Sequence, residues 1–128
     1  MTVLLDTCTF LWMATDEKQL SPTAMAVLAD PTNRRLLSAI SVLEISIKTR
    51  IGKLKLNGSV EQVVRLGMLK GVIGPFPVSI EHSLAVANLP LHHRDPFDRL
   101  IVGQAMAEGI PVVTNDVEIR KYAVQIIW

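Results

Sequence analysis

Two short apolar runs that each end in an aspartate constrain the fold of this chain more than any other feature. Residues 3–5 lead directly to Asp6, and residues 111–115 lead to Asp116. Such runs are typical of strands that are buried on both faces of a parallel sheet. Because ligands collect at the carboxyl ends of such strands, we expect Asp6 and Asp116 to be neighbours despite their separation in sequence.

Strand and helix patterns alternate along the 128 residues, without a linker, an internal repeat or a low-complexity segment. Strands are predicted at residues 2–6, 36–40, 76–78, 111–115 and 124–127, and helices around residues 10–13, 22–28, 41–50, 60–71, 81–87 and 96–108. This order implies right-handed crossovers between parallel strands. We therefore predict a single α/β domain over residues 1–128, a three-layer α/β/α sandwich around a central, mostly parallel sheet of about five strands.

Composition indicates the compartment. No stretch approaches the roughly 18 uncharged residues of a membrane helix, and Asp6 interrupts the apolar segment that a signal peptide would need. The single cysteine, Cys8, excludes an internal disulfide. We expect a cytoplasmic protein without a membrane partner. Since 49% of its residues are hydrophobic, a partner or a second copy is expected to cover part of its surface.

Two further acids lie near predicted helix starts. Glu44 follows Ser41 by three residues, and Asp98 follows Asp95 by three. First-turn carboxylates point back toward the end of the preceding strand, so both acids are expected near Asp6 and Asp116. Two unit charges about 4 Å apart repel by roughly 4 kcal/mol at an effective dielectric constant near 20, so a cluster of four carboxylates requires a cation.

Each acid also has a purely structural interpretation. Ser41 and Glu44 fit a capping box, in which the glutamate bonds the backbone of the cap residue. Asp95 fits an N-cap before Pro96, with Asp98 stabilising the helix dipole, and Asp116 fits a turn that caps a short helix. Asp6 is hardest to explain in this way, because a charge directly after a buried strand is costly. Taken together, the four acids favour a shared site.

Carboxylate oxygens are ligands for Mg²⁺, with Mn²⁺ as the natural substitute. Such a cation supplies a water nucleophile at neutral pH and stabilises a leaving oxygen, which is the chemistry of phosphodiester hydrolysis. Two other groups are weaker candidates. Adjacent His92 and His93 are not spaced to share a metal ion, and Cys8 has no evident base that would make it a nucleophile.

The net charge of +1 becomes +5 when the four clustered acids are set aside. Lys48 and Arg50 belong to a strip of basic residues that extends to Lys55 and contains no acid. Such a strip could steer a phosphate backbone toward the acidic site, and Arg99 is a further candidate. The alternative is a solvated helix end whose basic residues complement the helix dipole.

Four segments carry a resemblance to a known family: Leu5-Asp6-Thr7, Ser41-Val42-Leu43-Glu44-Ile45, His92-His93-Arg94-Asp95-Pro96-Phe97-Asp98-Arg99-Leu100 and Val113-Thr114-Asn115-Asp116. They resemble the motifs of PIN-domain nucleases, and most closely the VapC-type toxins of type II toxin-antitoxin pairs. The resemblance covers essentially the whole chain. It implies a Mg²⁺-dependent endoribonuclease that is usually a homodimer and is neutralised by a small antitoxin reaching its active site.

The resemblance also assigns residues. Asp6, Glu44, Asp98 and Asp116 match the family's acidic quartet, with Asp6 and Asp98 expected as direct metal ligands and Glu44 and Asp116 acting through water or as general bases. Thr114 and Asn115 match the polar residues beside the last acid. The family commonly has alanine where this chain has Gly103, which is expected to weaken the helix by up to about 1 kcal/mol.

Two alternatives remain open. The first is a PIN-like nuclease that acts in RNA processing or on DNA flaps outside a toxin-antitoxin pair. The second is a PIN-like module that binds RNA or protein without cutting. The sequence does not identify the RNA, because single-stranded RNA is recognised by loop shape and stacking surfaces that this aromatic-poor chain does not advertise.

Overall fold

A five-stranded sheet, parallel throughout, forms the centre of the computed structural model, which describes residues 1–128. The strand order is β3-β2-β1-β4-β5. The strands are β1 (Thr2–Leu5), β2 (Arg34–Ser38), β3 (Ile73–Phe76), β4 (Val112–Val113) and β5 (Ile126–Ile127).

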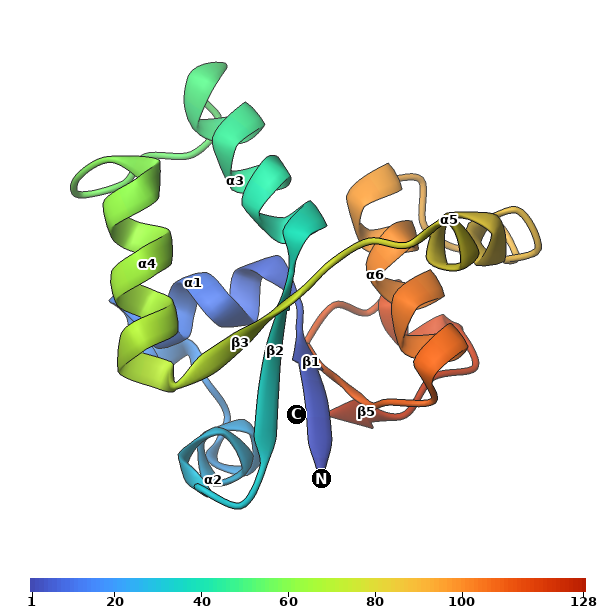
Figure 1. The fold of residues 1–128 in the computed structure, drawn as a ribbon, viewed down its shortest axis with the longest axis horizontal. Helices are drawn as coiled ribbons and strands as arrows, with labels where there is room; N and C mark the ends of the chain where they lie inside the picture. The colour runs from blue at the N-terminus through green and yellow to red at the C-terminus, as the bar shows by residue number, and fades with distance from the viewer.

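Helices cover both faces of this sheet (Figure 1). In chain order they are α1 (Thr7–Thr15), the 3₁₀ helix η1 (Glu17–Gln19), α2 (Pro22–Ala29), α3 (Ala39–Arg50), α4 (Val60–Gly71), α5 (Ile80–Val86), α6 (Pro96–Glu108) and the 3₁₀ helix η2 (Ile119–Lys121). One side carries α1, α2 and α4, and the other carries α5 and α6, while α3 rises from the carboxyl end of β2. The three-layer α/β/α prediction is confirmed. No helix of the structure combines the length and apolar character needed to cross a bilayer.

Side chains that alternate between the two faces of the central strand β1 contribute to two separate hydrophobic cores. Leu5 packs in the larger core with Phe10 of α1. Leu4 points the opposite way and packs with Ile101 and Ala105 of α6. All of these side chains are at most 1% exposed, so β1 is apolar on both faces, as a strand between two helical layers must be.

The sheet order also fixes where a ligand site can form. From β1 the chain builds β2 and β3 outward on one side, and then returns to place β4 and β5 on the other. The connections therefore leave β1 and β4 in opposite directions at their carboxyl ends, and this topological switch point is where open α/β sheets bind ligands.

The helix after β2 starts three residues earlier than the sequence predicted. Ser38, not Ser41, is the N-cap of α3, and its hydroxyl accepts the backbone N–H of Ile40 at 3.1 Å. The strand ends at Ser38 because its register with β1 is complete at Leu5 opposite Leu37. Ser41 therefore lies within α3, and the capping box with Glu44 does not form.

The third strand was also misplaced. It spans Ile73–Phe76 and not residues 76–78. Gly74 and Pro75 argue against a strand in the sequence, but β3 is an edge strand, where both residues are tolerated.

Candidate metal and active site

Asp6 lies where β1 meets α1 and is only 4% exposed. As the N-cap of α1, it accepts the backbone N–H of Thr9 at Oδ1, at 2.8 Å. The hydroxyl of Thr114, directly after β4, donates to its Oδ2. Burial raises the pKa of Asp6, the bonds from Thr114 and Thr9 oppose this rise, and the charge of Asp116 adds to it. Asp6 is thus a buried acid that joins the ends of two adjacent strands.

Glu44 is held from α1 and not by a cap of its own helix. The hydroxyl of Thr7 donates to Glu44 Oε1 at 2.6 Å and lies 3.0 Å from the hydroxyl of Ser41. Lys48, one turn further along α3, pairs with Glu44 Oε2. The glutamate is 5% exposed, and its bond from Thr7 connects α3 to the start of α1, next to Asp6.

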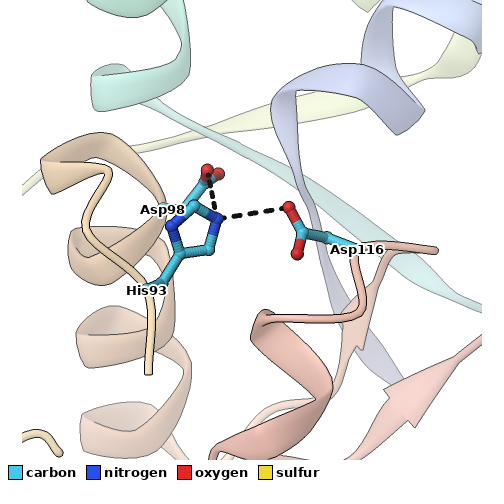
Figure 2. Close-up of side chains that lie close together, drawn as sticks. All are labelled: His93, Asp98 and Asp116. Carbon is cyan, nitrogen blue, oxygen red and sulfur yellow. Dashed lines mark hydrogen bonds and ion pairs between the residues drawn. The ribbon is translucent and has the colours of Figure 1, made fainter. Parts of the chain in front are cut away.

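Asp98 and Asp116 meet on either side of His93 (Figure 2). The Nε2 atom of His93 lies 3.1 Å from Asp98 Oδ2 and 3.3 Å from Asp116 Oδ2. One potential ligand atom from each of these three residues lies within 4.8 Å of the other two. This is the tightest grouping of potential metal ligands in the site.

Local caps orient both acids. Asp95 is the N-cap of α6 as predicted, accepting the backbone N–H groups of Phe97 at 2.8 Å and Asp98 at 3.4 Å. Asp116 caps the turn into η2 through Oδ1, which accepts the backbone N–H of Glu118 at 2.7 Å. The structural role predicted for Asp116 is therefore real, but it occupies one carboxylate oxygen and leaves Oδ2 facing the site.

The electrostatics show that the acids act on one another. Burial and the charges of Asp95, Glu44 and Asp116 raise the pKa of Asp98 to about 7, and His93 acts in the opposite direction. On Lys48, partial burial disfavours the ammonium, but the hydrogen bond and charge of Glu44 and the charges of Asp95 and Asp98 outweigh it and raise the pKa. Carboxylates that lie close together disfavour each other's ionised form, and a bound cation removes this penalty.

The sequence-derived residues thus fall into two groups. Asp98 and Asp116 approach within reach of a single ion, whereas Asp6 and Glu44 flank them and are linked to them through charge. Thr114 supports the site through its bond to Asp6 and by accepting the backbone N–H of Asp116 at 3.0 Å. Asn115 is exposed.

The three basic candidates differ in their surroundings. Lys48 pairs with Glu44 and lies 3.9 Å from Asp95, and Arg50 is exposed in the last turn of α3. Arg99 is engaged elsewhere: its guanidinium donates to the backbone carbonyls of residues 86, 89, 90 and 93 and to the Tyr122 hydroxyl. These contacts fix the loop before α6 and direct its donors away from a phosphate ligand.

Sequence reasoning missed His93, Thr7 and Ser41. His93 was set aside because adjacent histidines cannot share an ion, but only one of the two faces the site. The other, His92, packs edge-on against the ring of Tyr122 at 5.0 Å. The available signal was the position of His93 two residues before an N-cap aspartate, in the same block as Asp98.

The donor set fits a hard divalent cation. Asp6, Glu44, Asp98 and Asp116 supply carboxylate oxygens at one end of the sheet, with no thiolate beside the Asp98–Asp116 pair. Such oxygen donors suit Mg²⁺ or Mn²⁺. Burial and the neighbouring carboxylates both raise the pKa of Asp98, and a cation bound beside it would oppose both effects.

Comparison with known proteins identifies the fold and family of the chain. A search of curated proteins gave no match. Among solved structures, the chain is similar to the VapBC2 complex of Rickettsia felis bound to promoter DNA (TM-score 0.72, 14% identity, 98% of this chain and 97% of that chain). It is also similar to DNA-bound VapBC of Salmonella typhimurium (0.66, 15%, 98% and 96%). A third similar structure is VapBC-5 of Mycobacterium tuberculosis, from a family of toxin-antitoxin systems (0.60, 16%, 98% and 94%). The model of the PIN domain family matches residues 3–125, and the chain therefore belongs to the PIN domain family.

Proposed function

We propose that this protein is a Mg²⁺-dependent endoribonuclease toxin that hydrolyses RNA phosphodiester bonds and is neutralised by a small antitoxin protein. The observation that carries the proposal is the gathering of Asp6, Glu44, Asp98 and Asp116 at the switch point of the sheet, where burial, together with the charges of neighbouring acids that include Glu44 and Asp116, raises the pKa of Asp98 to about 7. Membership of the PIN family supports a nuclease activity for such a site.

The residues divide the work as follows. Asp98 and Asp116 are the direct ligands of a Mg²⁺ or Mn²⁺ ion, and Asp6 and Glu44 complete its negative surroundings. When bound, the ion supplies charge stabilisation for the scissile phosphate and an activated water. Thr7 and Thr114 hold the carboxylates of Glu44 and Asp6 through their hydroxyl groups.

Lys48 and Arg50 are proposed to bind the RNA backbone. They lie on α3 beyond Glu44, so an RNA strand bound at the acidic site would place a neighbouring phosphate near them. Basic residues beside an acidic site attract the phosphate chain, while the cation neutralises the acids. Arg99 is left out of this role because its donors are already bonded.

The proposed partners are an antitoxin and a second copy of the chain. The similar solved structures are VapBC complexes, which supports an antitoxin partner. Large apolar side chains are exposed on two helices, Leu66 and Leu69 on α4 and Ile80 and Leu84 on α5. Such surfaces are typical of protein interfaces. A homodimer would cover one of these two helix surfaces. We also propose that the protein acts in the cytoplasm, where RNA is available.

Cleavage by chelator-treated protein tests the proposal. Structured and unstructured RNA are incubated with wild type, with and without Mg²⁺ or Mn²⁺, beside Asp98→Asn and the matched control Asp95→Asn. Asparagine retains the N-cap at position 95, so this control should still cut. Metal-dependent cutting by wild type and the control, and its loss in Asp98→Asn, is the expected result.

Two outcomes would favour the alternatives. RNA binding by wild type without cleavage of any substrate would indicate a non-cleaving module. Cleavage without growth arrest when the protein is expressed alone, or arrest that a co-expressed antitoxin does not relieve, would indicate a nuclease outside a toxin-antitoxin pair.

A further inference from the structure

His93 looks like a third metal ligand in Figure 2, but its hydrogen bonds assign it another task. We propose that His93 is a positioning residue, whose Nε2–H group donates to Asp116 and lies against Asp98, and which thereby holds these two carboxylates side by side for a cation. We call this arrangement the bridge. As far as the cation is concerned, this inference rests on the proposed function. The bridge itself is a property of the metal-free protein.

The proton on the ring can be assigned from its partners. The backbone N–H of Asp95 donates to His93 Nδ1 at 3.1 Å. A backbone amide can only donate, so Nδ1 must present a lone pair, and the proton of the neutral ring lies on Nε2. Nε2 is the atom that lies 3.1 Å from Asp98 Oδ2 and 3.3 Å from Asp116 Oδ2.

This tautomer is incompatible with coordination by Nε2. A metal ion needs the Nε2 lone pair, so the proton would have to move to Nδ1, where it would face the N–H of Asp95. The ring would then lose one hydrogen bond and gain a contact between two donors. The carboxylates have no such restriction, because an oxygen that accepts a bond from His93 retains a second lone pair for a cation.

The loop that carries His93 is held firmly enough for this role. The backbone N–H of His93 donates to the Tyr122 hydroxyl at 2.9 Å, and the backbone carbonyl of His93 accepts from Arg99 Nη1 at 3.5 Å. Arg99 also donates to the carbonyls of Leu89 and Pro90 in the same loop and of Val86 at the end of α5. The fork of Arg99 therefore anchors the backbone, while the bond from Asp95 to Nδ1 sets the rotation of the ring.

The bridge counteracts the repulsion between the two carboxylates. Asp98 and Asp116 come from different segments, the start of α6 and the loop after β4, and their charges oppose close approach. His93 Nε2 donates to Asp116 Oδ2 and lies 3.1 Å from Asp98 Oδ2, so one ring atom keeps both carboxylates oriented inward before any ion is bound. Outer partners that orient ligands in this way change metal affinity by roughly 10–100-fold when they are removed.

Nuclear magnetic resonance of the metal-free protein tests the tautomer directly. With ¹⁵N-labelled histidine, long-range ¹⁵N–¹H correlations should show His93 protonated at Nε2 with an accepting Nδ1. A proton on Nδ1 of His93 would overturn the proposal, whatever the protein does with metal or RNA.

Mn²⁺ alone then probes the positioning role, using affinity and pulsed electron paramagnetic resonance. Wild type should bind Mn²⁺ without a directly coordinated ¹⁴N nucleus. His93→Ala should weaken binding by about 10–100-fold. His93→Gln, whose amide N–H can reach a position similar to Nε2, should recover most of the loss. The matched control His92→Ala should bind as wild type does.

The contrary results are distinct. A coupled ¹⁴N signal that disappears in His93→Gln would make His93 a ligand and overturn the proposal, as would equal Mn²⁺ affinity for wild type and His93→Ala. If wild type bound no Mn²⁺, the proposed metal-dependent function would fail, while the tautomer measurement would still decide whether the bridge exists. Circular dichroism of each variant confirms that it is folded.

Discussion

At Asp98, burial and three neighbouring carboxylates disfavour the charged form of one side chain. Its pKa rises from 3.8 to about 7, which corresponds to at most about 4 kcal/mol of free energy. An isolated surface acid would have no such cost. The folded metal-free protein therefore disfavours the ionised form of Asp98.

This shift predicts how stability depends on pH. Between pH values of about 4 and 7 the folded metal-free protein binds a proton at Asp98 that the unfolded chain releases, so its free energy of unfolding should fall as pH rises through this range. Urea denaturation at about pH 5 and about pH 8 should show a smaller decrease for Asp98→Asn, which has the same histidines and cannot titrate at this position. Equal decreases in the free energy of unfolding of both proteins would contradict a raised pKa at Asp98.

The pKa of the Cys8 thiol depends on the charges of the same site. The surrounding protein removes enough water from its sulfur to raise the pKa, and the charges of Asp6, Glu44 and Asp98 raise it further, to about 11. The residue is nevertheless exposed. Slow reaction of this thiol would therefore have an electrostatic cause and not a steric one.

We expect alkylation of Cys8 by iodoacetamide near neutral pH to be about 10-fold slower in the folded protein than in urea. A pKa of about 11 in place of 9.0 lowers the thiolate fraction about 100-fold, and the greater nucleophilicity of a more basic thiolate restores about half of this on a logarithmic scale. Glu44→Gln should react faster than wild type. Identical rates for the two folded proteins would contradict the influence of the acids on Cys8.

At the scale of elements, the sequence located most helices and strands but not the contacts that set their ends. The interval from Pro96 to Gly109 was predicted correctly because its N-cap, first-turn proline and final glycine are all local signals. The start of α3 was not, since Ser38 and Ser41 are equally good caps and only the pairing of β2 with β1 decides between them.

The same distinction explains the site. The four acids were identified from their positions at strand ends and helix starts, which are local features. Glu44 was singled out by its spacing from Ser41, yet it is held by Thr7, which is distant in sequence. His93 and the loop contacts of Arg99 depend on how α6 packs against the preceding loop, which no local pattern encodes.

Packing of α5 on α6 makes a specific prediction for Gly103. Helix propensity alone expects Gly103→Ala to stabilise α6 by up to about 1 kcal/mol. A Cβ atom at this position would lie 3.0 Å from Val86 Cγ2 and 3.1 Å from the carbonyl oxygen of His82. Because a backbone oxygen cannot easily move, we expect Gly103→Ala to destabilise the protein.

Thermal denaturation checks this expectation, with Ala107→Gly as the matched variant on the exposed side of α6. That control should cost about 1 kcal/mol through propensity alone. A higher melting temperature for Gly103→Ala than for wild type would contradict this expectation. It would show that α5 can move away and that helix propensity decides the effect of the substitution.

For the whole molecule, sheet order converts separate sequence segments into one site. β1 is central, β2 and β4 flank it, and their carboxyl ends bring together acids that lie between 38 and 110 residues from Asp6 along the chain. A parallel sheet with this order has one switch point. The acids gather there because of this topology.

Calorimetric titration of Mg²⁺ into chelator-treated protein tests the central claim, that these carboxylates form one cation site. Wild type should bind Mg²⁺, and Asp98→Asn and Asp116→Asn should each lower the affinity by roughly 10-fold or more. Asp30→Asn, an exposed acid near the opposite end of β2, should bind as wild type does. Equal affinity in all four proteins, or no binding by wild type, would contradict the account.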